Sequence, residues 1–147
     1  MAKAVIIYGT TTGNTETLAG FVADGLEAAG MDVRVKNVAD ASPNDLLGYD
    51  VIVLGSSTWG NGELQEDFID FYDKMKDGFL SGKKAAAFGP GDSSYDNFCI
   101  AVDMLESKLK ECGAEIVVNS LKVDGDVEEA ESQTQEWGKQ VAGIKRQ

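Results

Sequence analysis

Histidine is absent from this chain of 147 residues, and cysteine and proline each occur only twice. Without histidine, the commonest general base and the commonest transition-metal ligand are missing, so we expect neither a catalytic triad nor a zinc site. Cys99 and Cys112 fall in one helical pattern, at a spacing that disfavours a disulfide between them. We therefore expect two buried thiols, no metal ligands and no catalytic residues in a cytoplasmic protein.

Long apolar runs and excess positive charge are also absent. No apolar run approaches the roughly 20 residues that span a bilayer, and the first residues do not have the pattern of a signal peptide. The formal net charge is −12 at pH 7, so nucleic acids and anionic membranes are poor partners, whereas basic proteins are suitable ones. The length predicts one domain, over residues 1–147.

Apolar, β-branched runs alternate with helical patterns along the chain. We expect strands at Ala4–Tyr8, Val33–Val38, Val51–Gly55, Ala85–Gly89 and Glu115–Val118, the last extended by Leu121–Val123. We expect helices over about Gly13–Ala29, Glu66–Lys76, Asn97–Cys112 and Val127–Ile144, and a short helical turn after Ser42-Pro43. The alternation predicts an α/β fold: a doubly wound, five-stranded parallel sheet of order 2-1-3-4-5 with helices on both faces.

The first candidate loop, Gly9–Thr15, joins the first expected strand to the first expected helix. Its backbone N–H groups and threonine hydroxyls converge on a helix N-terminus, where the helix dipole favours an anion. The loop contains no lysine and no arginine. Neutral donors would therefore hold the anion, which favours one phosphate monoester over the triphosphate of a nucleotide hydrolase.

Two further candidate loops follow the third and fourth expected strands, at Ser56–Gly62 and Pro90–Phe98. In the predicted strand order these strands are neighbours of the first, so all three loops leave one edge of the sheet at its switch point. Trp59 and Tyr95 each stand among glycines and small polar residues. A phosphate site flanked by two aromatic side chains predicts a phosphorylated ligand with a flat ring.

Three segments of this chain resemble those of the flavodoxins: Thr10-x-Thr12-Gly13-x-Thr15, Ser57-Thr58-Trp59-Gly60 and Gly91-Asp92-Ser93-Ser94-Tyr95. The resemblance covers essentially the whole chain and is strongest to the short-chain flavodoxins of sulfate-reducing bacteria. It implies a flavodoxin-like fold with non-covalently bound FMN. It also implies a low-potential one-electron carrier that shuttles between semiquinone and hydroquinone and is not an enzyme with its own substrate.

The same resemblance assigns roles to individual residues. The residues that would bond the phosphate are Thr10, Thr12, Asn14, Thr15 and Ser57, helped by the backbone amides from Thr11 to Thr15. Trp59 would cover the inner face of the isoalloxazine, and Tyr95 would stack on its outer face. Gly60 would carry the carbonyl that turns toward the flavin N(5), and the backbone of Asp92 and Cys99 would meet the pyrimidine edge. The other candidate cofactor-binding residues are Gly13, Thr58, Asn61, Gly62, Pro90, Gly91 and Phe98.

Redox proteins with basic docking faces are the partners that a flavodoxin-like chain of this charge implies. Examples are low-potential reductases, ferredoxin-linked enzymes and cytochromes, and we expect the carrier to be a monomer. Asn61 and Pro90 differ from the residues common in such relatives, and we expect both to tune the redox potential. Proline in particular cannot donate a backbone hydrogen bond to the ring.

Other functions stay open from the residues alone. A phospho-acceptor receiver domain shares the topology but needs acids after the first and third strands, where this chain has Gly9 and Ser56. A P-loop hydrolase needs a lysine that does not follow Gly13. A small FMN-dependent reductase with its own substrate, or a scaffold without FMN, would share the fold. Trp59 and Tyr95 could also serve only as core aromatics.

Overall fold

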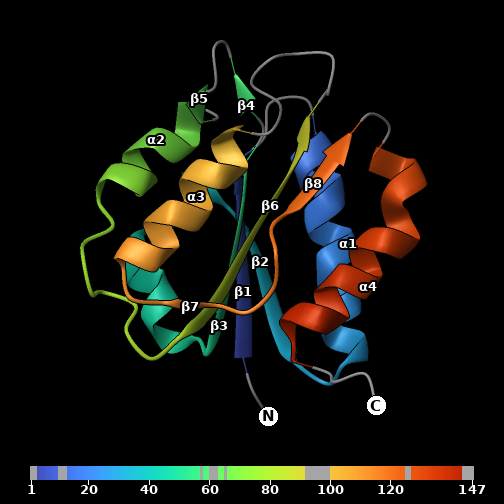
Figure 1. Ribbon diagram of the computed structural model, residues 1–147, viewed down its shortest axis with the longest axis horizontal. Helices are drawn as coiled ribbons and strands as arrows, with labels where there is room; N and C mark the ends of the chain where they lie inside the picture. The colour runs from blue at the N-terminus through green and yellow to red at the C-terminus, as the bar shows by residue number, and fades with distance from the viewer. Residues whose placement is uncertain are drawn as a thin grey trace.

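A central parallel sheet organises the computed structural model, which describes residues 3–9, 13–56, 58–59, 63–64, 66–91, 100–124 and 127–143 (Figure 1). In spatial order its strands are β2 (Asp32–Asn37), β1 (Lys3–Gly9), β3 (Val51–Ser56), β6 (Lys84–Gly91) and β7 (Glu115–Ile116). A further strand, β8 (Leu121–Asp124), pairs with the other end of β6. The predicted order 2-1-3-4-5 is thus confirmed, with the fifth strand split in two.

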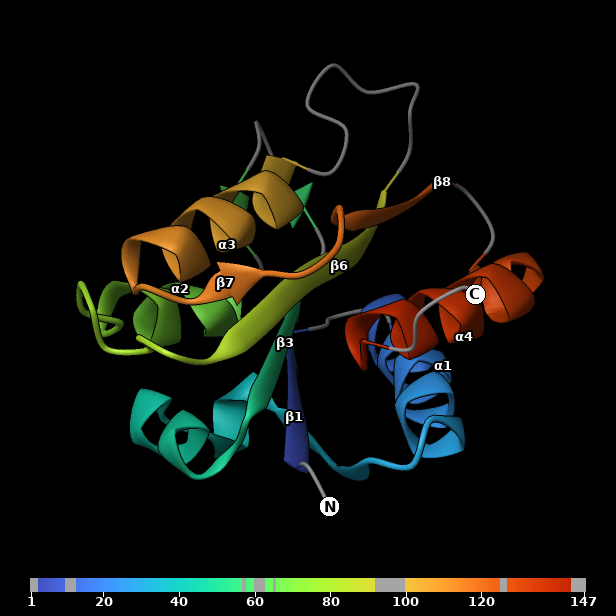
Figure 2. The ribbon, with the colours of Figure 1, turned by 60° about the horizontal axis from the view of Figure 1, so that its bottom comes forward.

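Helices cover both faces of this sheet (Figures 1 and 2). One face carries α1 (Asn14–Ala28) and α4 (Glu131–Val141), and the other carries α2 (Glu66–Asp73) and α3 (Ile100–Glu111). The described short helical turns are η1 (Val38–Asp40), η2 (Pro43–Gly48) and η3 (Val127–Ala130). Two strands of two residues each, β4 (Thr58–Trp59) and β5 (Glu63–Leu64), form a separate antiparallel pair.

Alternating side chains of the central strands build two separate cores. Along β1, Val5 and Ile7 face the core beneath α2 and α3, whereas Ala4, Ile6 and Tyr8 face the core beneath α1 and α4. Such burial on both faces explains why β1 and β3 are almost continuously apolar. The sequence therefore marks these two strands as central.

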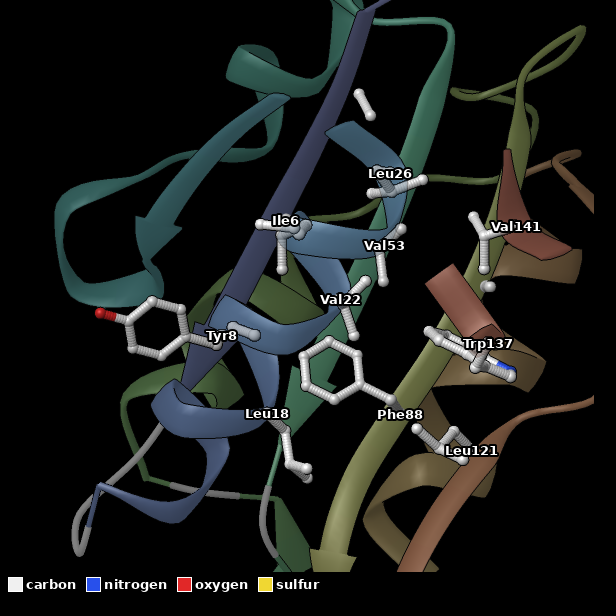
Figure 3. Packing of buried hydrophobic residues seen from close by; sticks show 14 of the residues in the cluster. Ile6, Tyr8, Leu18, Val22, Leu26, Val53, Phe88, Leu121, Trp137 and Val141 are labelled. Atoms are coloured by element: carbon white, nitrogen blue, oxygen red, sulfur yellow. The ribbon is translucent and has the colours of Figure 1, made fainter. Parts of the chain in front are cut away.

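The core beneath α1 and α4 is built around the ring of Phe88 (Figure 3). Trp137 meets this ring edge to face, with ring centroids 6.1 Å apart, and Trp137 Nε1 donates a hydrogen bond to the carbonyl oxygen of Asn119 at 2.8 Å. Gly55 leaves room for the same ring, because a Cβ there would lie 2.2 Å from Phe88 Cζ. Phe88 thus requires a glycine on the neighbouring strand.

Several predicted boundaries shift by a few residues. The helix predicted to reach Lys76 ends at Asp73 and continues as tighter turns, in which the N–H of Met75 donates to the carbonyl of Tyr72. The last helix begins with the η3 turn and is followed by Gly143, whose positive φ of 84° stops it. The turn predicted after Ser42 is confirmed as η2, since the N–H of Ser42 donates to Asp45 Oδ2 at 3.0 Å.

Two glycines allow α1 and α4 to pack backbone against backbone. A Cβ on Gly138 would lie 2.6 Å from the carbonyl oxygen of Val22, and a Cβ on Gly25 would lie 2.1 Å from that of Gln135. The neighbouring atoms are backbone, so they cannot move aside by a change of rotamer. Glycine at these two positions therefore sets the distance between the helices.

We expect Gly138→Ala to destabilise the protein by about 1–3 kcal/mol, the usual cost of overpacking a close contact. Gly20→Ala is the matched control, because Gly20 is an exposed residue of α1 with no atom within 4 Å of an added Cβ. That control should gain about 0.5–1 kcal/mol from lower backbone entropy in the unfolded chain. Urea denaturation measures both changes, and equal stability of the two variants would contradict the contact.

Candidate functional site

The described chain brings the ends of the central strands together at one edge of the sheet. Gly9 at the end of β1 pairs with Ser56 at the end of β3, and Gly91 at the end of β6 pairs with Asp124 of β8. After β1 the chain continues into α1 on one face, and after β3 it continues toward α2 on the other. Because the connections diverge there, the edge between β1 and β3 is the switch point where such sheets bind ligands.

The N-terminus of α1 lies at this switch point. Gly13 precedes the helix with a φ of +93°, a conformation that glycine adopts without steric cost. Both the N–H and the hydroxyl of Thr17 donate to the carbonyl oxygen of Gly13 at 3.0 Å. Gly13 has no side chain with which to cap the helix, so the first N–H groups of α1 are directed to the sheet edge, where they favour an anion.

Thr15 supplies a buried hydroxyl beside these N–H groups. The residue is completely buried, and its Oγ1 has no hydrogen-bond partner among the described residues. An unsatisfied buried hydroxyl costs about 1–3 kcal/mol. Ser56, at the end of β3, is also completely buried. A phosphate oxygen at the helix N-terminus would satisfy the Thr15 hydroxyl, so the residues present here fit the phosphate of FMN.

Tyr8 and Glu16 flank the first candidate loop on either side. Burial, and next the negative charge of Glu16, raise the pKa of the Tyr8 hydroxyl above its ordinary value of 10.0. The hydroxyl therefore stays protonated and neutral at physiological pH. Among the described residues that end β1, β3 and β6 or begin α1, none is basic. An anion bound here would be held by neutral donors and the helix dipole, and the anion site itself stays a prediction.

The second and third candidate loops differ from the prediction in two places. Thr58 and Trp59 form β4 and pair with β5, where an unpaired loop was predicted. Pro90 and Gly91 belong to β6, where the start of a loop was predicted. Since β3 pairs with β6 only as far as Phe88, the missing N–H of Pro90 leaves no gap in that ladder, while on the other side Pro90 lies in register with Val123 of β8.

The predicted site residues divide into those that the structure places and those outside its described ranges. The structure brings Gly13, Asn14 and Thr15 to the switch point, next to the strand end at Ser56. Outside the described residues lie Thr10, Thr11, Thr12, Ser57, Gly60, Asn61, Gly62, Asp92, Tyr95, Phe98 and Cys99.

Sequence reasoning missed two features of this region. Buried Ser56 was not among the candidate cofactor-binding residues, although a hydroxyl that ends a fully apolar strand is an available signal. The β4–β5 pair was also missed, although the dipeptide Asn61-Gly62 between Trp59 and Leu64 is a strong hairpin signal.

The remaining titratable groups do not form a second reactive centre in the described part of the chain. Cys112 is a free, buried thiol, and burial raises its pKa. In the described ranges, no group of three or more histidine, cysteine, aspartate or glutamate residues could hold a metal ion. No described helix is both long and apolar enough to span a bilayer.

Comparison with known proteins supports the resemblance seen in the motifs. The flavodoxin family model matches residues 6–137. A flavodoxin of Maridesulfovibrio salexigens is 50% identical over 145 residues, covering 97% of this chain and 98% of the relative. A flavodoxin of Nitratidesulfovibrio vulgaris is 40% identical over 144 residues, covering 96% of this chain and 97% of the relative. The structure of oxidised flavodoxin 2 from Bacillus cereus superposes with a TM-score of 0.91 at 38% identity, covering 97% and 99% of the two chains.

We expect Thr15→Val to separate stability from ligand binding. Losing an unsatisfied buried hydroxyl should stabilise the FMN-free protein by about 1 kcal/mol. Losing one phosphate donor should weaken FMN binding by about 10- to 150-fold, because a hydrogen bond to a charged group contributes about 1.5–3 kcal/mol. Riboflavin, which lacks the phosphate, should bind both proteins equally. Urea denaturation and quenching of flavin fluorescence measure these quantities.

The matched control is Thr134→Val on α4. Thr134 is also completely buried, and its Oγ1 likewise has no partner among the described residues. Thr134→Val should therefore raise stability to a similar extent and leave FMN affinity unchanged. Equal FMN affinity in Thr15→Val and the unmodified chain would show that the Thr15 hydroxyl does not contact the phosphate.

Proposed function

The chain belongs to the flavodoxin family of FMN-binding electron carriers, and from this premise we propose that residues 1–147 form a single domain with FMN at the switch point. It is an electron-transfer protein and not an enzyme with a substrate of its own. The observation that supports the position of FMN is the buried, unsatisfied hydroxyl of Thr15 at the N-terminus of α1. When bound, FMN supplies the redox chemistry.

The segments that leave the carboxyl edge would divide the cofactor between them. We propose that the segment between β1 and α1, with Asn14, Thr15 and Ser57, holds the phosphate. Trp59 and Tyr95 enclose the flavin ring, and Gly60, Asp92 and Cys99 meet its polar edge through the backbone. Support comes from the register, since Gly9 lies opposite Ser56 and the chain enters α1 four residues after Thr10. These residues bind and orient the cofactor and exclude water from it.

Acidic residues around this edge would set a low redox potential. Glu16 lies in the first turn of α1, Asp124 ends β8, and the chain carries a net charge of −12. Each carboxylate disfavours adding a further negative charge to the site, although salt screens the exposed ones. A summed repulsion of about 1.4 kcal/mol lowers a one-electron potential by about 59 mV. We propose that the carrier operates at low potential for this reason.

The visible spectrum during stepwise anaerobic reduction is the direct test of this function. We expect the FMN-free protein to bind FMN, and the complex to be reduced in two separate one-electron steps with a coloured form between them. A single two-electron step would favour a reductase with its own substrate, and oxidation of NADPH without a partner protein would support that alternative. Failure to bind added FMN would refute the proposed site.

Charge also indicates the kind of redox partner. Flavodoxins pass electrons to and from redox partners, and for this acidic chain we propose partners with basic docking faces. Low-potential reductases, ferredoxin-linked enzymes and cytochromes are the classes that we propose. We further propose that the carrier works as a monomer in the cytoplasm, since a free, buried Cys112 is compatible with a reducing compartment.

Electron transfer to a basic cytochrome should be fast at low salt and slow at high salt. We expect the second-order rate constant to fall about tenfold or more between 10 and 200 mM salt, because screening removes electrostatic steering. Stopped-flow absorbance measures this rate. The rate with an uncharged small electron donor is the control and should change little, while a cytochrome rate independent of salt would contradict the proposed docking.

A further inference from the structure

An ion pair joins β8, the strand that lies beside the end of β6, to the start of α3. Lys122 lies on β8, in register with Gly89 of β6, two residues before β6 ends. The Nζ of Lys122 lies 2.7 Å from Oδ1 of Asp103, which belongs to the first turn of α3. The strand that enters the segment between β6 and α3 and the helix that follows it are therefore linked through Lys122, in addition to the direct packing of Val102 of α3 close to Gly89 of β6.

The chain around Lys122 is held from both faces of the sheet. On one face, the Ser120 hydroxyl donates a hydrogen bond to Glu106 of α3. On the other, Trp137 of α4 donates to the carbonyl of Asn119 at 2.8 Å. Figure 2 shows β8 running beside the end of β6 after the break in the fifth strand. Both hydrogen bonds lie just before β8, so they fix the position from which Lys122 reaches Asp103.

The charges that face Lys122 are balanced. The hydrogen bond from Ser120 lowers the pKa of Glu106, although burial opposes this, and Lys110 and Lys122 lower it further. Glu106 is therefore ionised, and Lys110 Nζ lies 3.3 Å from its Oε2. Asp103 is left as the direct partner of Lys122. The two charged side chains are 52% and 33% exposed, for Asp103 and Lys122 respectively, so their interaction is modest and sensitive to salt.

We propose that Lys122 is a positioning residue for the flavin ring, which acts by linking the end of β6, through β8, to the first turn of α3. This inference rests on the proposed function, in which the segment between β6 and α3 carries Tyr95 and the polar contacts to the ring. The backbone ladder places Lys122 beside Gly89, near the end of β6, and the ion pair connects Lys122 to Asp103 at the start of α3. Lys122 is therefore close to both ends of that segment. Without this link, part of the binding free energy would be spent on bringing β6 and α3 into place, and the affinity for the flavin ring would fall.

The test measures the dissociation constants of FMN, riboflavin and inorganic phosphate with the FMN-free protein. The variants are Lys122→Met, Asp103→Asn and the double substitution. We expect each single variant to weaken the binding of FMN and of riboflavin by the same factor, about threefold, because a partly exposed ion pair contributes little free energy. The double variant should lose no more affinity than either single variant, since each single substitution already removes the whole interaction. Phosphate binding should not change.

Two features of this design separate positioning from a simple charge effect. Lys122→Met makes the chain more negative and Asp103→Asn makes it less so, yet both should weaken ring binding. Lys74→Met is the control, because its ion pair with Asp70, at 3.3 Å, joins the residue just after α2 to the turn before it and links no other strand or helix. It should leave the affinities for FMN and riboflavin unchanged.

Three results would each overturn the inference. Lys122→Met and Asp103→Asn could change the affinity for riboflavin in opposite directions, phosphate affinity could fall as much as riboflavin affinity, or the affinity for FMN and riboflavin could stay unchanged. The last of these would leave the proposed function intact, because the unmodified chain would still bind FMN. If the unmodified chain bound neither FMN nor riboflavin, the proposed function would fail and this inference with it.

Discussion

The pairing of β1 with β3, which sets Gly9 opposite Ser56, is the constraint on which the rest of this molecule depends. Because the two strands are parallel neighbours, they end at one edge of the sheet. Because their following helices cover opposite faces, neither helix covers that edge. This arrangement places the N-terminus of α1 and the buried hydroxyl of Thr15 at that edge. It also places there the ends of β3 and β6, from which the other two candidate loops leave.

Binding and stability oppose each other at this edge. A threonine hydroxyl that is buried without a described partner costs free energy in the FMN-free chain, and it becomes useful only when an anion accepts a hydrogen bond from it. Ligand that binds only the folded state then stabilises the protein further, in proportion to the logarithm of its concentration. Thr134 shows the same deficit in α4, at a position for which the structure suggests no such use.

The sequence predicts this fold well, because the signals of the central strands are local. Val51–Leu54 and Ala4–Ile7 are apolar on both faces, and each strand leads into a helix with its own apolar stripe. The extension of β6 through Pro90 was not predictable in this way, since it depends on where β3 stops and β8 begins. For the same reason, the contact between Lys122 and Asp103 emerges only from the register of the assembled sheet. In the site itself, the motif predicted the start of α1 but not the burial of Ser56, which depends on packing from both sides.

The close contact between α1 and α4 has a consequence for how this chain acquires its structure. Gly25 and Gly138 are distant in sequence, so the contact that covers α1 forms only when both ends of the described chain are present. During synthesis on the ribosome, β1 and α1 emerge first, and the part of α1 that contacts α4 stays uncovered until α4 has followed. Contacts of such long range also slow folding. A nascent chain therefore cannot complete the pair of α1 and α4 before translation has passed α4.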